Sequence, residues 1–440
     1  MPSYIVFDVK TRKVIITCTV TGLVMFAIGI GIGYASRKGS SNTDSPTASV
    51  AEAIRATCSG PAAQTPSGKL YFDRFVQRHN EKYACVKTKE ECWNLGLPRN
   101  YIAYHLNGKT ITIDGKLDDD AWKEVPWSET FVDMRSSVYP KPYLDTKFKI
   151  RWDDERMYIG VYIQENNLWA TLTTHDAAIS TENGVEFLMD VDGSLFNFKQ
   201  MQINVLGTMM DQLFYKSPYD SPDVQVWFQD WQPDVRKAVN TDGTVNTPGD
   251  EDKYWSIEVS LSFAKLAERS QRAQPNPVEN EAWFIQFGRS EQNLTVEKGQ
   301  YKIVPGSESQ WWSWQQCDTI NLLLQDRWGL VQFKKNLSDK KFRFDRWHIY
   351  KALFVMRDAM KKFQSVNGKY TNKIEELDVP PYLLSGTCVE VPEITFTFKN
   401  NAIAFNYVTN PITGFVVTVK SKLISHKPAH IRSDRYVTFQ

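Results

Sequence analysis

The fold of this chain is decided by three stretches of sequence, I-T-I-D-G-K-L-D-D-D-A-W at residues 111–122, F-K-I-R-W-D-D-E-R-M-Y-I-G-V-Y-I at 148–163 and V-E-F-L-M-D-V-D-G at 185–193. In the second stretch Phe148, Ile150 and Trp152 alternate with charged residues, and this period of two is typical of a strand that buries one face. The stretches therefore predict β-strands that end in acidic turns.

The same alternation continues toward the C-terminal end. It recurs at residues 255–261 and 283–287, where apolar residues occupy every second position. Breaks rich in Asp or Pro separate the runs, and Asp242-Gly243 is typical of a tight hairpin turn. Many short strands with turns between them predict a mainly β protein built as an antiparallel β-sandwich.

The motifs in these strands resemble those of the family 9 carbohydrate-binding modules. They are I-D-G-x-L-D-x-x-A-W at 113–122, W-D-D-x-x-x-Y-I at 152–159, an acidic element from Glu186 to Asp190 and a closing W-G-x-V-Q-F at 328–333. The resemblance covers about half of the chain, residues 101–333. It implies a jelly-roll-like arrangement of two packed antiparallel sheets, and a polysaccharide or oligosaccharide as the ligand.

Composition and charge limit the class of function. The 440 residues are 42% hydrophobic and include 14 Trp, enough for a sizeable core and for two folded units. Lys and Arg number 52 against 51 Asp and Glu, so no large basic field exists to hold a nucleic-acid backbone. We therefore expect no nucleic acid among the partners.

An apolar segment near the N-terminus predicts a membrane anchor. Residues 14–35 carry no charge, and such a run is long enough to cross a lipid bilayer as a helix. Three basic residues precede it and two follow it, which favours a single-pass protein with a cytoplasmic N-terminus and an extracellular or lumenal bulk. A cleaved signal peptide is the alternative, since Gly33 and Ala35 are small residues at plausible cleavage positions.

Five of the six cysteines lie beyond this segment, where an exported chain meets oxidising conditions. Cys85 and Cys92 are close enough in sequence for a local disulfide. Cys317 with Cys388 is a further possible pair, and Cys58 is left over.

Two acceptor patterns for N-glycosylation agree with export. They are Asn293-Leu-Thr and Asn336-Leu-Ser. Such short patterns often arise by chance, so they only support the predicted topology.

Changes in composition divide the chain into six segments. A cytoplasmic tail (1–13) and the anchor (14–35) precede a Ser-, Thr- and Pro-rich stalk (36–68) and a lead-in segment (69–100). The predicted carbohydrate-binding sandwich follows at 101–335. Apolar residues at helical spacing, ending before Gly368, then predict a helix, which with a small β-sheet forms an α+β appendage at 336–440.

Sugar binding needs an aromatic ring that stacks on the C–H face of the sugar. Trp311, Trp312 and Trp314 crowd a Ser- and Gln-rich stretch, and three Trp in four positions cannot all point into one sheet face. The resemblance places one wall of an aromatic slot at Trp314, with the alternative that one or two of the three cap the sandwich. The Trp expected for the opposite wall is missing at 180–184, and Trp169 replaces it only if it does not fill the core.

Polar side chains must pair with the sugar hydroxyls. Gln200, Gln202 and Asn204 alternate with apolar residues and so share one strand face, and each amide offers both a donor and an acceptor. The resemblance adds Glu186 at the family's carboxylate position and Arg289 where the family also carries an arginine. We expect Glu186, Gln202, Asn204 and Arg289 to bind the sugar, with the alternative that these residues form only the solvated face of a sheet.

No cofactor is required by this chemistry, but one turn suits a structural calcium ion. Asp190-Val-Asp192-Gly193 is compact and rich in oxygen, and the resemblance implies structural calcium in this family. The turn lacks the twelve-residue helix-loop-helix pattern. An acidic turn without a metal is the alternative.

The sequence favours a binding protein over an enzyme. Glycoside hydrolysis needs two carboxylates at a defined separation, and the sequence singles out no such pair. No G-x-S-x-G elbow, phosphate loop or H-E-x-x-H motif is present. We therefore predict a membrane-anchored carbohydrate-binding protein. The alternatives are a glycoside hydrolase or accessory protein in carbohydrate catabolism, and a surface adhesion or scaffold protein that has lost sugar binding.

Overall fold

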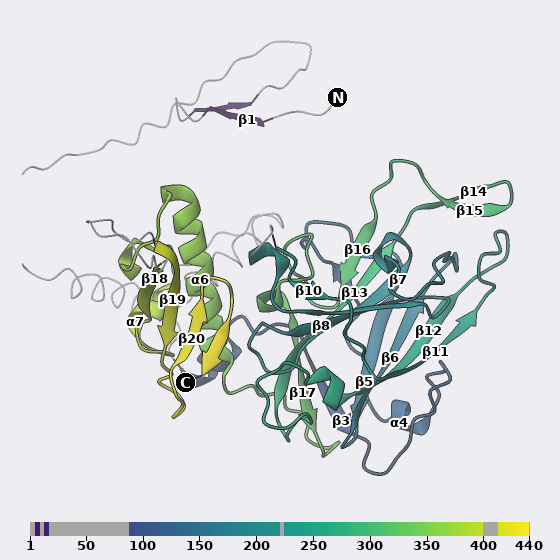
Figure 1. Ribbon diagram of the computed structural model, residues 1–440, viewed down its shortest axis with the longest axis horizontal. Coiled ribbons are helices and arrows are strands. Elements are labelled where there is room, and N and C mark those ends of the chain that lie inside the picture. The colour runs from purple at the N-terminus through teal and green to yellow at the C-terminus, as the bar shows by residue number, and fades with distance from the viewer. Residues whose placement is uncertain (1–4, 9–12, 17–87, 221–223, 399–411, 440) are drawn as a thin grey trace, which may run out of the picture. The chain divides into compact units, whose positions relative to one another are not determined.

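The computed structural model describes residues 5–8, 13–16, 88–220, 224–398 and 412–439 (Figure 1). The chain divides into two units, residues 1–49 and 50–440. In the first unit, strands β1 (Ile5–Asp8) and β2 (Lys13–Ile16) pair as an antiparallel hairpin.

The membrane helix predicted at residues 14–35 is not found where the structure describes that segment. Residues 14–16 lie in strand β2, and residues 17–35 lie outside the described residues. Within the described ranges, no helix is both long and apolar enough to cross a membrane. The stalk predicted at 36–68 also lies outside the described residues.

One large, curled β-sheet dominates the second unit (Figure 1). Its strands follow one another in the order β10, β9, β8, β7, β13, β17, β3, β5, β6, β12 and β11, and β16 and β4 branch from β13. Their bounds are β3 (Asn100–His105), β4 (Val132–Asp133), β5 (Thr146–Trp152), β6 (Arg156–Gln164), β7 (Gly184–Asp190), β8 (Phe198–Asn204), β9 (Met209–Phe214), β10 (Trp227–Phe228), β11 (Val235–Asp242), β12 (Tyr254–Ser262), β13 (Ala282–Glu291), β16 (Gln310–Ser313) and β17 (Gly329–Lys334).

The sheet is mixed, which corrects the prediction of a purely antiparallel sandwich. Strand β3 runs parallel to both of its neighbours, β17 and β5, whereas pairings such as β13 with β7 and β5 with β6 are antiparallel. Alternation of apolar and polar residues shows which face a residue occupies, but it carries no information on the direction of the neighbouring strand. The mainly β, sandwich-like architecture itself is confirmed.

The curl of the sheet encloses a hydrophobic core. In β13, Trp283, Ile285 and Phe287 point into this core, whereas Phe284 lies on the other face and belongs to a second apolar cluster. We call the face toward the first core the inner face and the opposite one the outer face. Because successive side chains of a strand point to opposite faces, the period of two in the sequence sorts residues between the two faces.

The I-D-G-x-L-D-x-x-A-W motif packs on the outer face of the sheet. Glu258 of β12 accepts hydrogen bonds from the backbone N–H groups of Asp114 and Gly115 and from Trp122 Nε1, each at 2.8 Å. Gly115 has a φ of +87°, and an added Cβ would lie 2.6 Å from the backbone of Val239. Only glycine fits this close approach. These motif residues therefore stabilise the fold.

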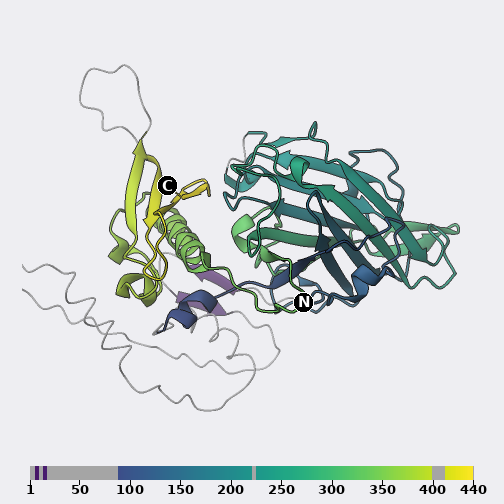
Figure 2. The same cartoon turned by 90° about the horizontal axis from the view of Figure 1, so that it is seen from below.

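Helix α6 (Trp347–Asn367) packs between the large sheet and a small one (Figure 2). Its Tyr350 and Leu353 belong to the second apolar cluster together with Phe284 of β13 and Val417 of the small sheet. As predicted, the helix ends at Gly368, which adopts a left-handed φ of +70°. The small antiparallel sheet contains β18 (Glu393–Phe398), β19 (Ile412–Val419), β20 (Ala429–Arg432) and β21 (Val437–Phe439).

The remaining elements are short. They are α3 (Lys89–Asn94), α4 (Asp120–Lys123), α5 (Phe263–Leu266), α7 (Pro381–Ser385), the 3-10 turns η1 (Ile179–Thr181), η2 (Pro218–Asp220), η3 (Gln325–Arg327) and η4 (Ile374–Glu376), and the hairpin of β14 (Leu294–Glu297) and β15 (Gln300–Ile303).

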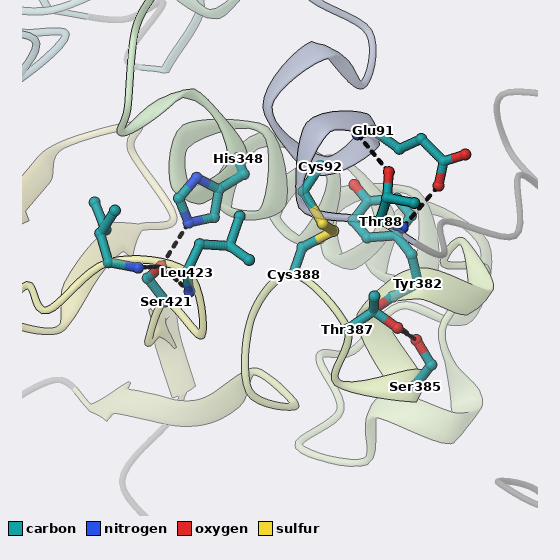
Figure 3. Close-up of a disulfide and its surroundings, with 11 residues drawn as sticks. Thr88, Glu91, Cys92, His348, Tyr382, Ser385, Thr387, Cys388, Ser421 and Leu423 are labelled. Carbon is teal, nitrogen blue, oxygen red and sulfur yellow. Dashed lines mark hydrogen bonds between the residues drawn. A yellow bond between two sulfur atoms is a disulfide. The ribbon is translucent and has the colours of Figure 1, made fainter.

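A disulfide links α3 to the segment before β18 (Figure 3). Cys92 bonds to Cys388, 296 residues away, so the predicted pairing of Cys92 with Cys85 is wrong; Cys85 lies outside the described residues. Cys317, the other suggested partner of Cys388, is a buried free thiol. Cys85 was the predicted partner of Cys92 because the short loop between them costs little entropy to close. The fold instead packs Cys92 and Cys388 into the apolar cluster that contains α6.

Candidate functional site

The residues predicted to bind sugar lie on both faces of the large sheet. In the register of β13 and β7, Gly288 pairs with Glu186 and Arg289 pairs with Val185. Glu186 in turn pairs with Gln202 of β8 and lies beside it on the outer face. Arg289 points to the inner face, because Phe287, two residues before it, lies in the inner core. The predicted set is therefore divided by the sheet.

The structure buries two of the three candidate stacking indoles. Trp314 is 1% exposed and Trp312 is 2% exposed, so the expectation that they present an open face is wrong. Trp314 lies so close to β17 that a Cβ added at Gly329 would be 2.4 Å from its ring. Trp169, considered for the opposite wall, is buried as well. Trp311 is half-buried and shares the outer face with Glu186.

On the outer face, one carboxylate lies among three amides. We call Glu186, Gln200, Gln202 and Gln212 the outer cluster. Gln200 donates to Glu186 Oε1, Gln202 Nε2 donates to Glu186 Oε2 at 3.2 Å, and Gln212 donates to Gln200. Burial raises the pKa of Glu186 to about 7, and the two amide donors only partly oppose that rise.

Two apolar side chains, one from a loop and one from η1, cover the glycines beside the outer cluster. A Cβ added at Gly288 would lie 2.5 Å from Leu322, and one added at Gly184 would lie 3.0 Å from Ile179. The side chains of Glu186 and Gln202 are buried. Members of the outer cluster thus bond to one another beneath this cover, although Gln202 Oε1 is buried without a hydrogen-bond partner.

Asn204 holds the turn between β8 and β9. Its Oδ1 accepts hydrogen bonds from the backbone N–H groups of Leu206 and Thr208, both at 3.1 Å. Its Nδ2 donates to Leu172 O at 2.9 Å and to Glu182 Oε2 at 3.4 Å. The atoms expected to bind sugar are therefore engaged within the protein.

On the inner face, Arg289 lies between two carboxylates. We call Arg289, Glu165, Glu291 and Asn183 the inner cluster. Arg289 Nη2 donates to Glu165 Oε2 at 3.0 Å and to Glu291 Oε2 at 2.8 Å, and Asn183 Nδ2 donates to Glu291 Oε1 at 3.1 Å. Burial raises the pKa of Glu291, against the attraction of the guanidinium.

Two aromatic rings adjoin the inner cluster, and one of them is open to solvent. The guanidinium carbon of Arg289 lies 4.9 Å from the centroid of the Trp312 ring. Tyr143 packs edge-on against Trp312, with centroids 5.3 Å apart, and is 58% exposed. The backbone N–H of Gln292 donates to Asn183 Oδ1 at 2.8 Å and holds this residue at the end of β13. The inner cluster thus combines an exposed ring with buried charged groups.

Sequence reasoning found Arg289 and Trp312 but missed the residues around them. Tyr143 stands in a Pro-containing break before β5, and Glu165 directly follows β6. Such positions at strand ends follow no period of two. The signal that was available is the aromatic pair Tyr139 and Tyr143 in a connection that Pro140 and Pro142 keep out of a strand.

The acidic turn after β7 is held by its own carboxylates. Asp190 accepts hydrogen bonds from the N–H groups of Gly193 at 3.0 Å and Leu195 at 2.8 Å, and Asp192 Oδ1 accepts one from Ser194 at 2.9 Å. Burial raises the pKa of Asp190 well above its ordinary value. These bonds use the oxygens that we assigned to calcium, and calcium binding at Asp190 and Asp192 stays a prediction.

The two glycosylation patterns differ in exposure. Asn336 is exposed in the segment after β17, which suits a glycan. Asn293 is half-buried before β14, and its Nδ2 donates to Glu308 O at 3.3 Å. Modification of either asparagine stays a prediction.

An open groove lies on another part of the sandwich. It has a volume of about 620 Å³ and is lined by residues that include Tyr101, Trp127, Glu129 and Lys340. Trp127 is half-buried, and the ammonium group of Lys149 lies 4.7 Å from the centroid of its ring. This groove also offers an aromatic ring beside polar groups.

Residues 113–244 match the family model described as "Carbohydrate family 9 binding domain-like". Among solved structures, the chain is similar to a family 9 carbohydrate binding module from Caldicellulosiruptor kristjanssonii in complex with cellotriose, with 12% identity, 56% of this chain and 100% of that chain covered, and a TM-score of 0.35. The chain is also similar to a module of the same family and organism in complex with glucose, at 14% identity. This match covers 55% of this chain and 99% of that chain, with a TM-score of 0.35. A third similar structure is that of a putative carbohydrate-binding protein from Bacteroides uniformis ATCC 8492, at 10% identity. This match covers 54% of this chain and 100% of that chain, with a TM-score of 0.39. No curated protein matches the sequence.

Proposed function

Because residues 113–244 belong to the carbohydrate family 9 binding domain-like family, we propose that this protein binds a polysaccharide or an oligosaccharide. The family match is the observation that carries the proposal. It agrees with the motifs in β5, β6 and β7, which are all strands of the large sheet. Sugar binding needs an aromatic surface next to paired donors and acceptors, and the inner cluster has both.

We place the sugar at the inner cluster, with Tyr143 as the ring it first meets. The outer cluster is less suitable, because Leu322 and Ile179 cover the glycines beside it. At the inner cluster, Tyr143 is the exposed ring that packs edge-on against Trp312. A sugar stacked on Tyr143 would lie beside Trp312, and Arg289, whose guanidinium packs on the Trp312 ring, would with its carboxylates read the hydroxyls on that side.

A Tyr143→Ala variant of the full-length protein tests this site. We expect weaker retention on immobilised polysaccharide and an affinity for cellotriose that falls roughly fivefold, as about 1 kcal/mol of stacking is lost. The matched control is Tyr219→Ala, because Tyr219 is 59% exposed and lies on η2. Equal loss in both variants would refute the assignment to the inner cluster.

The groove around Trp127 is the competing location. If Trp127→Ala abolishes retention while Tyr143→Ala leaves it unchanged, the sugar binds in the groove and the inner cluster is structural. If the wild-type protein is retained on no glycan of a broad array, carbohydrate binding itself is wrong and the scaffold alternative gains support.

We further propose that residues 14–35 anchor the protein in a bilayer, with the sandwich outside the cytosol. The uncharged run of apolar residues supports this, as does the pattern of basic residues around it. Extraction of membranes with alkaline carbonate should leave the wild-type chain in the pellet and release a variant that lacks residues 14–35. Release of both would contradict the anchor.

A further inference from the structure

Three ionisable side chains converge where the loop between β6 and β7 meets β9. His175 and Asp176 come from the loop, and Asp211 comes from β9. His175 Nε2 lies 3.4 Å from Asp211 Oδ1 and 3.6 Å from Asp176 Oδ1. The possible ligand atoms of the three residues all lie within 4.8 Å of one another.

Asp211 is a buried carboxylate without a hydrogen bond. Its side chain is fully buried, and neither of its oxygens accepts a hydrogen bond from the described residues. It occupies the same strand face as Met209 and Leu213, which belong to the inner core. A carboxylate placed there is costly unless a cation compensates it, and burial raises the pKa of Asp211 to about 6.

The two aspartates are fixed relative to each other by the backbone. The N–H of Asp176 donates to Met209 O at 3.0 Å, and the N–H of Asp211 donates to Asp176 Oδ1 at 3.3 Å. His175 is exposed, so solvent reaches the cluster from its side. A small ion can therefore enter without a rearrangement of the strand.

We propose that His175, Asp176 and Asp211 form a binding site for a divalent transition-metal cation, for which Zn²⁺ is the best fit. Ligands about 2.0–2.1 Å from a tetrahedral zinc lie about 3.3–3.4 Å from one another, close to the two separations from His175 Nε2. One imidazole nitrogen with two carboxylate oxygens suits zinc, whereas calcium prefers six to eight oxygen ligands. Water would complete the coordination on the exposed side.

A bound ion would tie the loop to β9. Residues 165–183 form this connection, and its two ends carry Glu165 and Asn183 of the inner cluster. The ion would thereby also hold the inner cluster in place. Zinc binding does not itself require a sugar, because all three ligands lie outside that cluster.

Isothermal titration of the chelator-treated, full-length protein with ZnCl₂ tests the proposal. We expect one zinc site per chain that weakens at least tenfold in His175→Ala and in Asp211→Asn, since removing even a supporting group of a metal site costs tenfold or more. The control is His426→Ala, an exposed histidine elsewhere, and it should bind as the wild type does. Zinc should also raise the midpoint of thermal unfolding of the wild type and the control only.

Three outcomes would overturn the site. The first is zinc affinity in His175→Ala equal to that of the wild type, which would assign the metal to other ligands such as thiols. The second is tighter binding of CaCl₂ than of ZnCl₂. The third is the absence of zinc binding to the wild type. If Asp211→Asn fails to fold, His175→Ala decides the question, because its side chain is exposed and its loss does not open the core.

Discussion

The two faces of β13 show how differently one sheet can bury a carboxylate. On the inner face, Glu165 and Glu291 share the guanidinium of Arg289, so opposite charges are buried together. On the outer face, Glu186 is buried with amide donors and without a cation among the hydrogen-bond partners of its side chain. Gly288, opposite Glu186, and Arg289 are neighbours in sequence, yet a single step along the strand separates the two environments.

This difference determines whether removing a buried charge lowers or raises the stability of the fold. Removing one member of a buried ion pair leaves an uncompensated charge, which is strongly destabilising. Removing a lone buried carboxylate takes away a desolvation cost. We therefore expect charge removal to act in opposite directions on the two faces. Beside β13, the inner face combines its charges with an exposed ring, Tyr143, which is why we place the sugar there.

The largest effect should come from the apolar part of the inner face. Trp314→Ala removes a fully buried indole that packs against Phe148, with ring centroids 5.0 Å apart. Replacing such a side chain leaves a cavity and costs about 3–5 kcal/mol. Urea unfolding followed by circular dichroism should show a large shift of the midpoint.

Trp311→Ala is the control for this substitution, because the half-buried Trp311 lies on the outer face and its loss should cost less. If Trp314→Ala unfolds at the wild-type midpoint but loses retention on polysaccharide, the indole is a stacking surface after all. Trp314 would then belong to the sugar site and not to the core.

The second effect concerns the charges of the inner cluster. Arg289→Gln leaves Glu165 and Glu291 buried without a cation, and we expect a loss of about 3–4 kcal/mol of stability. Adding Glu165→Gln and Glu291→Gln to this variant should restore part of the loss, because no unpaired charge then remains. Urea unfolding at pH 7.5 measures both changes.

Arg343→Gln provides the matched control, since Arg343 forms an ion pair with Asp345 in which both side chains are about half exposed. Exposed pairs contribute about 0–1 kcal/mol, so this variant should unfold close to the wild type. Equal destabilisation by Arg289→Gln and Arg343→Gln would show that burial of the inner cluster has no energetic consequence.

Local patterns predicted the β class, the family and the end of α6 because each depends on residues close in sequence. Gly368 ends the helix through its own left-handed conformation, and the period of two marks strands such as β5. The sequence pattern also sufficed to predict that Glu186 and Arg289 lie on opposite faces of the sheet. Val185 and Phe187 point inward, which puts Glu186 outward, and Phe287 points inward, which puts Arg289 inward as well.

Contacts between distant segments could not be read in this way. Leu322 comes from a loop 136 positions after Glu186, and nothing in its own neighbourhood marks it as a cover for β13. The same holds for Cys388 as the partner of Cys92, and for the parallel placement of β3 beside β17. Each of these contacts depends on tertiary packing. Hydrophobic periodicity shows which face of a strand is buried, but it does not show which distant segment packs against that face.

The smallest effect, and one of opposite sign, belongs to Glu186→Gln. The folded state holds the Glu186 proton up to a pKa of about 7, above the ordinary value of 4.5, so it binds more protons than the unfolded state between these two pH values. Stability should therefore fall as pH rises from about 4.5 to about 7, by roughly 3 kcal/mol at most. Glutamine mimics the neutral acid, so the variant should lack this fall and should equal or exceed the wild type at pH 8.

Free energies of unfolding measured at pH 5 and pH 8 give the test, with Glu251→Gln as the control at an exposed position. The new amide has an acceptor within the outer cluster, because Gln202 Oε1 is buried without a partner and can turn toward it. A Glu186→Gln variant that is less stable than the wild type at pH 8 would mean that an unseen cation compensates Glu186. The two faces would then bury their carboxylates in the same way, and the contrast between them would disappear.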